Sequence, residues 1–266
     1  SVWALVVVVS LCSGFIATVE EHVHSASADV SVSNRPAWAK WSKLRAALAD
    51  EPNLSAMAPR LVHYGLIHHP GKRPAPPPLP GRTALHGGDQ PFLFVLGIHA
   101  AEEAAATGFG GWITDPDIAP ELRVKDPQNA LAPQHGVPSV LLGVERMRAE
   151  GLRPGDTLVL TTGVLRTAPD GTKSPQQVQI PLVIAGAYKT KHGGFDGNNL
   201  FVDIGTLQQE LLEGDTDAVH EIAIAVRDES QLDETADRIA RIVHRAVDRG
   251  DQMARGTAQT WREKNL

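Results

Sequence analysis

The sequence predicts an α+β protein, because segments with the two-residue repeat of strands and segments with the 3.6-residue repeat of helices follow one another without a regular order. The composition supports a folded chain: 42% of the 266 residues are hydrophobic and 21% are charged, which is typical of a globular protein. A chain of this length can form one large domain or two smaller ones.

The first half of the chain begins with residues 28–33, whose alternating pattern predicts a half-buried strand. Pro36–Ala49 has apolar residues at helical spacing and predicts a helix. Two short strands, Leu54–Ala58 and Arg60–Ile67, are expected on either side of Pro59. Residues 70–91 are rich in proline and predict a loop, and Phe92–Ile98 follows as a buried strand.

The second half predicts further strands and helices around one extended hairpin. Strands are expected at residues 138–142, 157–162, 178–189, 199–204 and 220–227, and helices at residues 99–107, 143–151, 205–212 and 231–249. Residues 114–137 are interrupted by prolines and predict irregular structure. Residues 163–177 form the hairpin arm, with Pro169-Asp170-Gly171 at its centre. We expect its prolines and glycine to disfavour continued sheet pairing.

The N-terminal segment from Val2 to Ala17 carries no charge and is apolar on every face. A membrane span needs about 20 such residues, and a signal peptide would need a basic region that is absent here. The segment predicts the outer part of a transmembrane helix. A buried core helix or strand is the alternative, since periodicity does not separate these cases.

Signatures of common catalytic and binding chemistry are missing. The sequence holds no glycine-rich dinucleotide loop, no P-loop lysine, no Gly-x-Ser-x-Gly elbow and no His-Glu-x-x-His. Cys12 is the sole cysteine, which excludes an intrachain disulfide and a thiolate metal site. The net charge is −6 and the sequence has no long run of basic residues, which argues against a nucleic-acid partner. We therefore expect no cofactor, no metal and no catalytic residue.

Three local patterns have both a functional and a structural interpretation. His22-x-His24 and His68-His69 have no nearby cysteine and no acidic cluster at ligand spacing, so surface histidines are favoured over a metal site. Glu102-Glu103 could be an acid and base pair, but adjacent helical residues diverge, which favours a solvated helix start. His192–Gly197 could cradle an anion, but it precedes a strand and predicts a turn.

Several segments in order resemble the extracytoplasmic domain of FtsX-like ABC transporter permeases, the MacB-type periplasmic core, and most of all the lipoprotein-releasing LolC/LolE group. The segments that carry the resemblance are residues 8–15, 28–32, 59–66, 96–98, 141–156, 183–186, 195–196 and 260–266. Each is a short run of small or apolar residues, and their collinearity over most of the chain is what identifies the family.

The resemblance implies a two-part periplasmic domain that follows the end of a transmembrane helix. The implied parts are 1–27, the end of transmembrane helix 1 and its exit; 28–98 and 216–250, a Porter-like βαβ unit; 99–215, a Sabre-like mixed unit with the arm 163–177; and 251–266, a connection toward transmembrane helix 2. Such domains do no chemistry. An ABC ATPase hydrolyses ATP in a separate subunit or domain, a second permease protomer completes the transporter, and the whole lies in the inner (cytoplasmic) membrane.

The resemblance also implies a role for the arm, because LolC-type members dock a periplasmic lipoprotein carrier with a hairpin called the hook. The corresponding partner-binding candidates are Val164, Leu165, Arg166, Thr167, Ala168, Pro169, Asp170, Gly171, Thr172, Lys173, Ser174 and Pro175. The implied function is release or export of lipoprotein or other amphipathic cargo. A MacB-like efflux or FtsX-like regulatory permease is an alternative, and a membrane-anchored hydrolase with a pocket of convergent polar groups is another.

Overall fold

The computed structural model of the chain describes residues 27–33, 39–70, 93–167, 170–246 and 257–265. Among these residues, nine strands form one mixed sheet in the order β11-β1-β10-β3-β4-β8-β5-β7-β6, and a small two-stranded sheet pairs β2 with β9. The α+β fold class predicted from the sequence is confirmed. Residues 1–26, which contain the predicted transmembrane segment, and most of the proline-rich loop lie outside the described residues.

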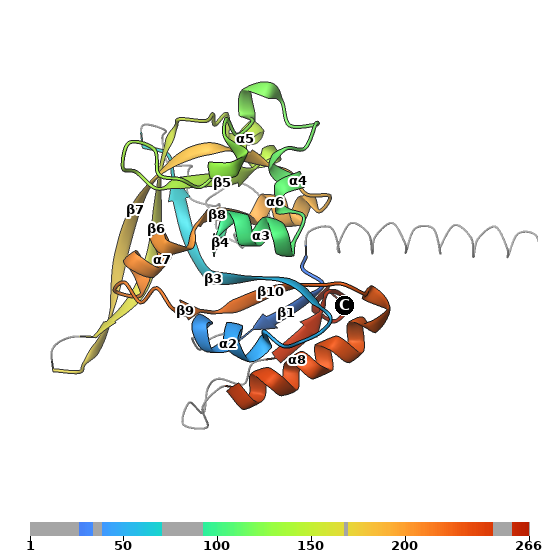
Figure 1. The fold of residues 1–266 in the computed structure, drawn as a ribbon. Coiled ribbons are helices and arrows are strands. Elements are labelled where there is room, and N and C mark those ends of the chain that lie inside the picture. Colours follow the sequence, from blue (N-terminus) through green and yellow to red (C-terminus); the bar gives the residue numbers. More distant parts are fainter. Residues whose placement is uncertain (1–26, 34–38, 71–92, 168–169, 247–256, 266) are drawn as a thin grey trace, which may run out of the picture.

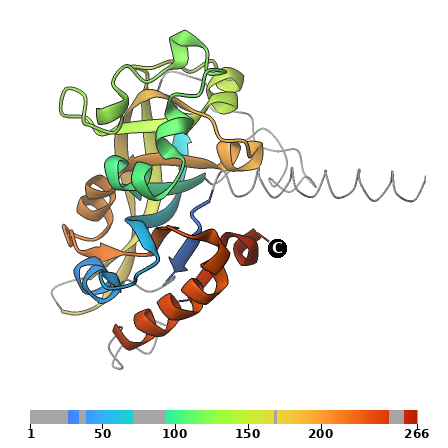
Figure 2. The same ribbon diagram turned by 45° about the vertical axis from the view of Figure 1, so that its right-hand side comes forward.

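One end of the sheet, which we call the terminal sheet, is formed by β11, β1, β10 and the first half of β3 (Figure 1). Helices α2 and α8 pack beside it, and both lie on the lower side of the molecule in the two views (Figures 1 and 2). The elements are β1 (Val30–Ser33), β2 (Ala39–Lys40), α2 (Trp41–Leu48), β3 (Leu54–His68), β9 (Ala218–Val219), β10 (Glu221–Val226), α8 (Leu232–Ala246), β11 (Thr257–Thr260) and α9 (Trp261–Asn265).

The other end of the sheet closes into a ring of six strands, which we call the barrel: β3, β4, β8, β5, β7 and β6, with β6 returning to β3. Gly65 permits this closure, since a Cβ there would lie 2.4 Å from Leu160 Cδ1 and 2.9 Å from the Thr161 carbonyl oxygen. The elements are β4 (Leu93–Ile98), α3 (Ala100–Ala106), α4 (Phe109–Ile113), β5 (Ser139–Gly143), α5 (Val144–Glu150), β6 (Thr157–Thr167), β7 (Lys173–Tyr188), α6 (Gly193–Asn198), β8 (Asn199–Asp203) and α7 (Ile204–Leu211).

Strand β3 is shared by the terminal sheet and the barrel. The prediction of two short strands about Pro59 is wrong, because β3 runs through this residue without a break. The His220 amide donates to the Arg60 carbonyl, so the backbone N–H and C=O groups of Arg60 point toward β10. The backbone nitrogen and C=O group of the preceding residue, Pro59, point to the opposite side of the strand. On that side the ladder with β4 begins only at Arg60. The missing N–H of proline therefore costs no ladder hydrogen bond.

One further prediction is corrected. His192–Gly197 is not a turn: residues 193–198 form α6, and the His192 ring Nδ1 caps it by accepting from the Phe195 amide at 2.9 Å. A side-chain acceptor at a helix start satisfies one of the unpaired N–H groups, a role for histidine that composition did not suggest.

The segment implied to be a connection toward the next span also contributes a strand. Within residues 251–266, Thr257–Thr260 form β11, which adds to the edge of the terminal sheet and pairs with β1.

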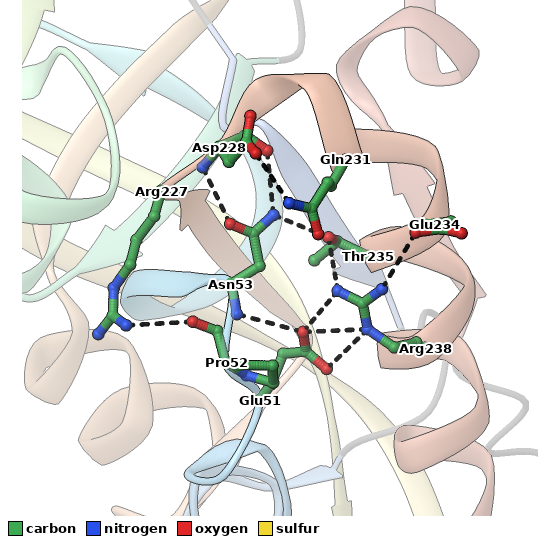
Figure 3. Close-up of polar contacts among 9 residues, drawn as sticks. All are labelled: Glu51, Pro52, Asn53, Arg227, Asp228, Gln231, Glu234, Thr235 and Arg238. Atoms are coloured by element: carbon green, nitrogen blue, oxygen red, sulfur yellow. Dashed lines mark hydrogen bonds and ion pairs between the residues drawn. The ribbon is translucent and has the colours of Figure 1, made fainter.

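A buried polar network fixes α8 to the loop before β3 (Figure 3). Arg238 Nη2 donates to Glu51 Oε1 at 2.9 Å, and Asn53 Nδ2 donates to Thr235 Oγ1 at 2.8 Å. The Asp228 amide donates to Asn53 Oδ1 at 2.9 Å, which adds the loop before α8 to the network. Hydrogen bonding to Arg238 is the main cause that lowers the pKa of Glu51 below its ordinary value, against the opposing effect of burial.

The lowered pKa of Glu51 predicts a pH-dependent contribution to stability. A carboxylate whose folded pKa lies below its unfolded pKa stabilises the fold above the unfolded value, here 4.5, and loses this effect as the pH falls through the folded value. Glu51→Gln should therefore unfold at a lower temperature than the wild type at pH 7, and the difference should shrink below pH 4.5. Melting curves across this range check it, and a difference that grows toward low pH would contradict it.

Candidate interaction arm

The strands β6 and β7 form a long antiparallel hairpin that projects beyond the barrel (Figure 1). The pairing runs without a register shift from Thr157–Val183 to Thr167–Lys173. We call the outer part, Gly163–Thr167 with Lys173–Gln177 and the tip between them, the arm. The expectation that prolines disfavour pairing here is wrong, because Pro175 pairs with Leu165 inside the ladder.

Pro175 is tolerated because its missing N–H points away from the neighbouring strand. The Ile184 amide donates to the Asp156 carbonyl, which places even-numbered residues of β7 toward β6. Pro175 therefore faces the open edge of the arm, as prolines in edge strands do. The sheet can continue to the tip, and the arm is a two-stranded ribbon with open edges.

Alternation along β6 sorts the arm residues into buried and exposed positions. Val164 is 8% exposed and packs in the main core with Leu160, whereas Leu165 is 67% exposed. Val164 is thus unavailable to a partner, and among the described residues of the arm Leu165 is the large apolar side chain that is exposed. The structure does not describe Ala168, Pro169 or the side chains of Thr167 and Lys173. The remaining candidates, Asp170, Gly171, Thr172, Ser174 and Pro175, lie at the tip or on the returning strand.

Arg166 attaches the arm to the end of α7. Its Nη2 donates to the Glu210 carbonyl oxygen at 2.5 Å, and its Nη1 lies 3.5 Å from Glu213 Oε1. The tip beyond this contact has its own short-range order, since Asp170 Oδ1 accepts from the Thr172 amide at 2.9 Å. This hydrogen bond is the main cause that lowers the pKa of Asp170. Arg166 therefore fixes the base of the arm and leaves Leu165 exposed.

An exposed aromatic pair lies at the root of the arm and was not predicted. Tyr64 on β3 and Phe94 on β4 are direct cross-strand partners with ring centroids 5.7 Å apart, and they are 52% and 41% exposed. Thr162 Oγ1 donates to the Tyr64 carbonyl oxygen at 2.7 Å, which joins this part of β3 to β6. Strands at Arg60–Ile67 and Phe92–Ile98 were predicted from the sequence, but their pairing with each other was not.

His63 forms a second contact between β3 and the arm. Its Nε2 lies 3.2 Å from the Gly163 carbonyl oxygen. Burial lowers the pKa of His63 below its ordinary value, and the Gly163 carbonyl partly opposes this by raising it. His63 and Thr162 thus hold the root of the arm against the barrel.

The other sequence candidates do not gather into a site. Within residues 27–33, 39–70, 93–167, 170–246 and 257–265, no group of three or more His, Cys, Asp or Glu residues could hold a metal ion. His22 and His24 lie outside these ranges. The prediction that Glu102 and Glu103 form a solvated helix start is wrong for Glu103, which is fully buried and bound to Arg60.

A cleft of about 530 Å³ lies between the start of β1, the α3–α4 connection and residues 189–191. Its polar side chains already hold structural partners. Asp29 Oδ2 accepts from the Val226 amide at 2.8 Å, and Thr190 Oγ1 donates to Asp196 Oδ1 at 2.6 Å. These contacts give the lining residues a role in joining neighbouring elements.

Comparison with known proteins identifies the family. The family model described as MacB-like periplasmic core domain matches residues 1–242. The periplasmic region of MacB from Actinobacillus actinomycetemcomitans aligns with a TM-score of 0.50 and 9% identity over 88% of both chains, which shows a shared fold. The extracellular domain of the ABC-type transporter YknZ from Gram-positive bacteria aligns at a TM-score of 0.45 and 11% identity, over 86% of this chain and 98% of that one.

The comparison with curated proteins found no match. In the described part of the chain, no helix is long and apolar enough to cross a membrane. The family match spans most of the sequence and agrees with the mixed sheet described above. The chain belongs to the family of MacB-like periplasmic core domains, and it is the extracytoplasmic domain of an ABC transporter permease.

Proposed function

We propose that this domain serves a permease that releases or exports lipoprotein or other amphipathic cargo, and that the arm docks a soluble carrier for that cargo. The observation that carries the proposal is the arm itself: a paired ribbon that projects from the barrel, has open edges and presents Leu165 at 67% exposure. Open strand edges accept an added strand, and an exposed apolar side chain fits a groove. Either mode binds a partner without chemistry by this chain.

The transporter around the domain follows from the same proposal. Residues 1–27 form the end of a transmembrane helix, and residues 251–266 lead toward the next span, so β1 and β11 receive the motion of the membrane part. The terminal sheet corresponds to the Porter-like unit and the barrel with its helices to the Sabre-like unit. Strand β3 is shared by both, and β4, which belongs to the implied Porter-like range 28–98, lies in the barrel. A separate ABC ATPase subunit and a second permease protomer complete the assembly in the inner membrane.

Shortening the arm tests the docking role. Replacing residues 165–175 with Asn-Gly joins Val164 to Gln176, whose backbones face each other, so a two-residue turn closes the hairpin. We expect melting to change little, because Val164 and the barrel strands stay in place. Pull-down of the periplasmic lipoprotein carrier of the same organism should be lost.

A point variant sharpens the test. Leu165→Asp should weaken carrier binding by about tenfold or more, as expected when an apolar contact at the centre of an interface is removed. Gln179→Asp is the matched control, because it adds the same charge at an exposed position of β7 outside the arm. Binding that survives both the shortened arm and Leu165→Asp would exclude the docking role and favour a MacB-like efflux or FtsX-like regulatory permease.

A further inference from the structure

One residue belongs to both halves of the molecule. Arg60 on β3 is the Cα partner of Glu221 on β10 in the terminal sheet, and it is also the partner of Ile98 on β4 in the barrel. Before Arg60, β3 pairs with β10; after it, β3 pairs with β4 and then with β6. Arg60 therefore stands where the shared strand passes from one unit to the other.

The side chain of Arg60 binds one carboxylate from each unit. Its Nη1 donates to Glu221 Oε1 at 3.0 Å, on β10 of the terminal sheet. Its Nε donates to Glu103 Oε2 at 3.1 Å and its Nη2 donates to Glu103 Oε1, on α3, which packs against α4 on the barrel side and also on β3 and β10. The guanidinium is the one side chain that supplies donors in this fixed fork geometry.

All three residues are buried: Arg60 is 7% exposed, Glu103 0% and Glu221 3%. Burial lowers the pKa of Arg60, but the charges and hydrogen bonds of Glu103 and Glu221 raise it more, so its net pKa lies above the ordinary value. Separating α3 from β10 would leave charges buried without partners, which costs far more than stretching an apolar contact. The cluster resists displacement of one unit against the other.

We propose that Arg60, with Glu103 and Glu221, is the positioning element that transmits motion from the terminal sheet to the barrel and its arm. The inference rests on the proposed function, in which β1 and β11 receive motion from the membrane part. Arg60 carries that motion to α3 and along β3, which contacts α7, and the contact of Arg166 with the end of α7 joins α7 to the arm. A buried ionic cluster suits this role because its hydrogen bonds fix one relative position of the three side chains, whereas apolar contacts tolerate several.

The test is amide hydrogen exchange of the full-length permease with its ATPase, with and without ATP and vanadate. In the wild type, ATP should change exchange rates in β1 and β11 and also in α3 and the arm strands by about fivefold, the lower end of coupling between linked sites. In Arg60→Met/Glu103→Leu/Glu221→Leu, the change should remain in β1 and β11 and fall below about twofold in α3 and the arm.

Replacing a buried ionic triad with apolar residues often leaves stability unchanged, so this variant should fold, with a cooperative urea transition. If it does not fold, Glu221→Gln removes the charge on the β10 side only and should reduce the ATP-dependent change in α3 at least by half. The matched control is Arg238→Met/Glu51→Leu, which removes an ion pair confined to the terminal sheet and its helices. The control should keep the change in α3.

Three results would overturn the proposal: an ATP-dependent change in α3 that persists in the triple variant or in Glu221→Gln, the absence of that change in the wild type, and its loss in the control. A wild-type transporter that releases no lipoprotein would exclude lipoprotein as the cargo. It would not affect the exchange result on Arg60, because the exchange measurement needs no cargo.

Discussion

Arg60→Met should lower the free energy of unfolding by about 3–5 kcal/mol, the range for breaking a buried ion pair from one side. The change removes the partner of two carboxylates that are 0% and 3% exposed, and methionine offers neither charge nor donors to replace it. Urea unfolding of the 266-residue chain measures the loss. This is a large fraction of the stability of an ordinary domain.

The triple variant provides the control for this measurement. Arg60→Met/Glu103→Leu/Glu221→Leu leaves no unpaired charge, so its stability should lie close to that of the wild type although it carries more substitutions. A single variant that loses less than about 1 kcal/mol, or a triple variant less stable than the single one, would show that Arg60 does not balance these carboxylates in the fold.

Gly143→Ala should lower the free energy of unfolding by about 3 kcal/mol, at the upper end of the usual cost of overpacking. A Cβ at Gly143 would lie 2.0 Å from the Asp196 carbonyl oxygen and 2.6 Å from its carbonyl carbon. These are backbone atoms of α6, so the clash can be removed only if α6 moves away from the end of β5. Chemical unfolding measures the effect.

Gly163→Ala is the matched control for the glycine prediction. No atom lies within 4 Å of a Cβ built at Gly163, so alanine fits there and removes flexibility from the unfolded chain. We expect its stability to equal or exceed that of the wild type. Equal losses in the two variants would contradict the claim that close approach of α6 is what requires glycine at position 143.

The sequence predicted elements whose own residues carry the signal. The helix ending at Gly151 and the strands around it follow from local periodicity, and the helix predicted at residues 231–249 is observed as α8 with Leu232, Ala236, Ile239 and Val243 buried. The resemblance to the MacB-type periplasmic core is confirmed by the family match over residues 1–242, whereas the likeness to the LolC/LolE group stays a prediction. These features depend on residues close together in the chain.

Features that depend on distant residues were missed. Glu103 was predicted to lie at a solvated helix start because adjacent helical residues diverge and acidic residues are favoured there, whereas its partner Arg60 lies on a strand 43 residues earlier. Val164 was predicted to bind a partner from its place in the arm. Its burial was missed because it depends on the packing of the main core. The pairing of β6 with β3, which closes the barrel, also joins residues far apart, and Gly65 gives no local sign of it.

The interaction arm was predicted only in part, because its strand pairing also depends on distant residues. Its existence was predicted from the turn residues around Asp170, but its full pairing was not, because the position of Pro175 relative to the ladder is set by register. A shift of one residue would turn its missing N–H toward β6. Register is fixed by the whole hairpin and its contacts with β5.

Release of a lipoprotein from reconstituted vesicles tests the central claim most directly. The full-length permease and its ATPase are placed in proteoliposomes with a lipoprotein of the same organism, and ATP-dependent transfer to the soluble carrier is measured. The wild type should transfer the lipoprotein, and the variant in which Asn-Gly replaces residues 165–175 should hydrolyse ATP at a similar rate but transfer none. Transfer by the shortened variant at the wild-type rate would contradict the account.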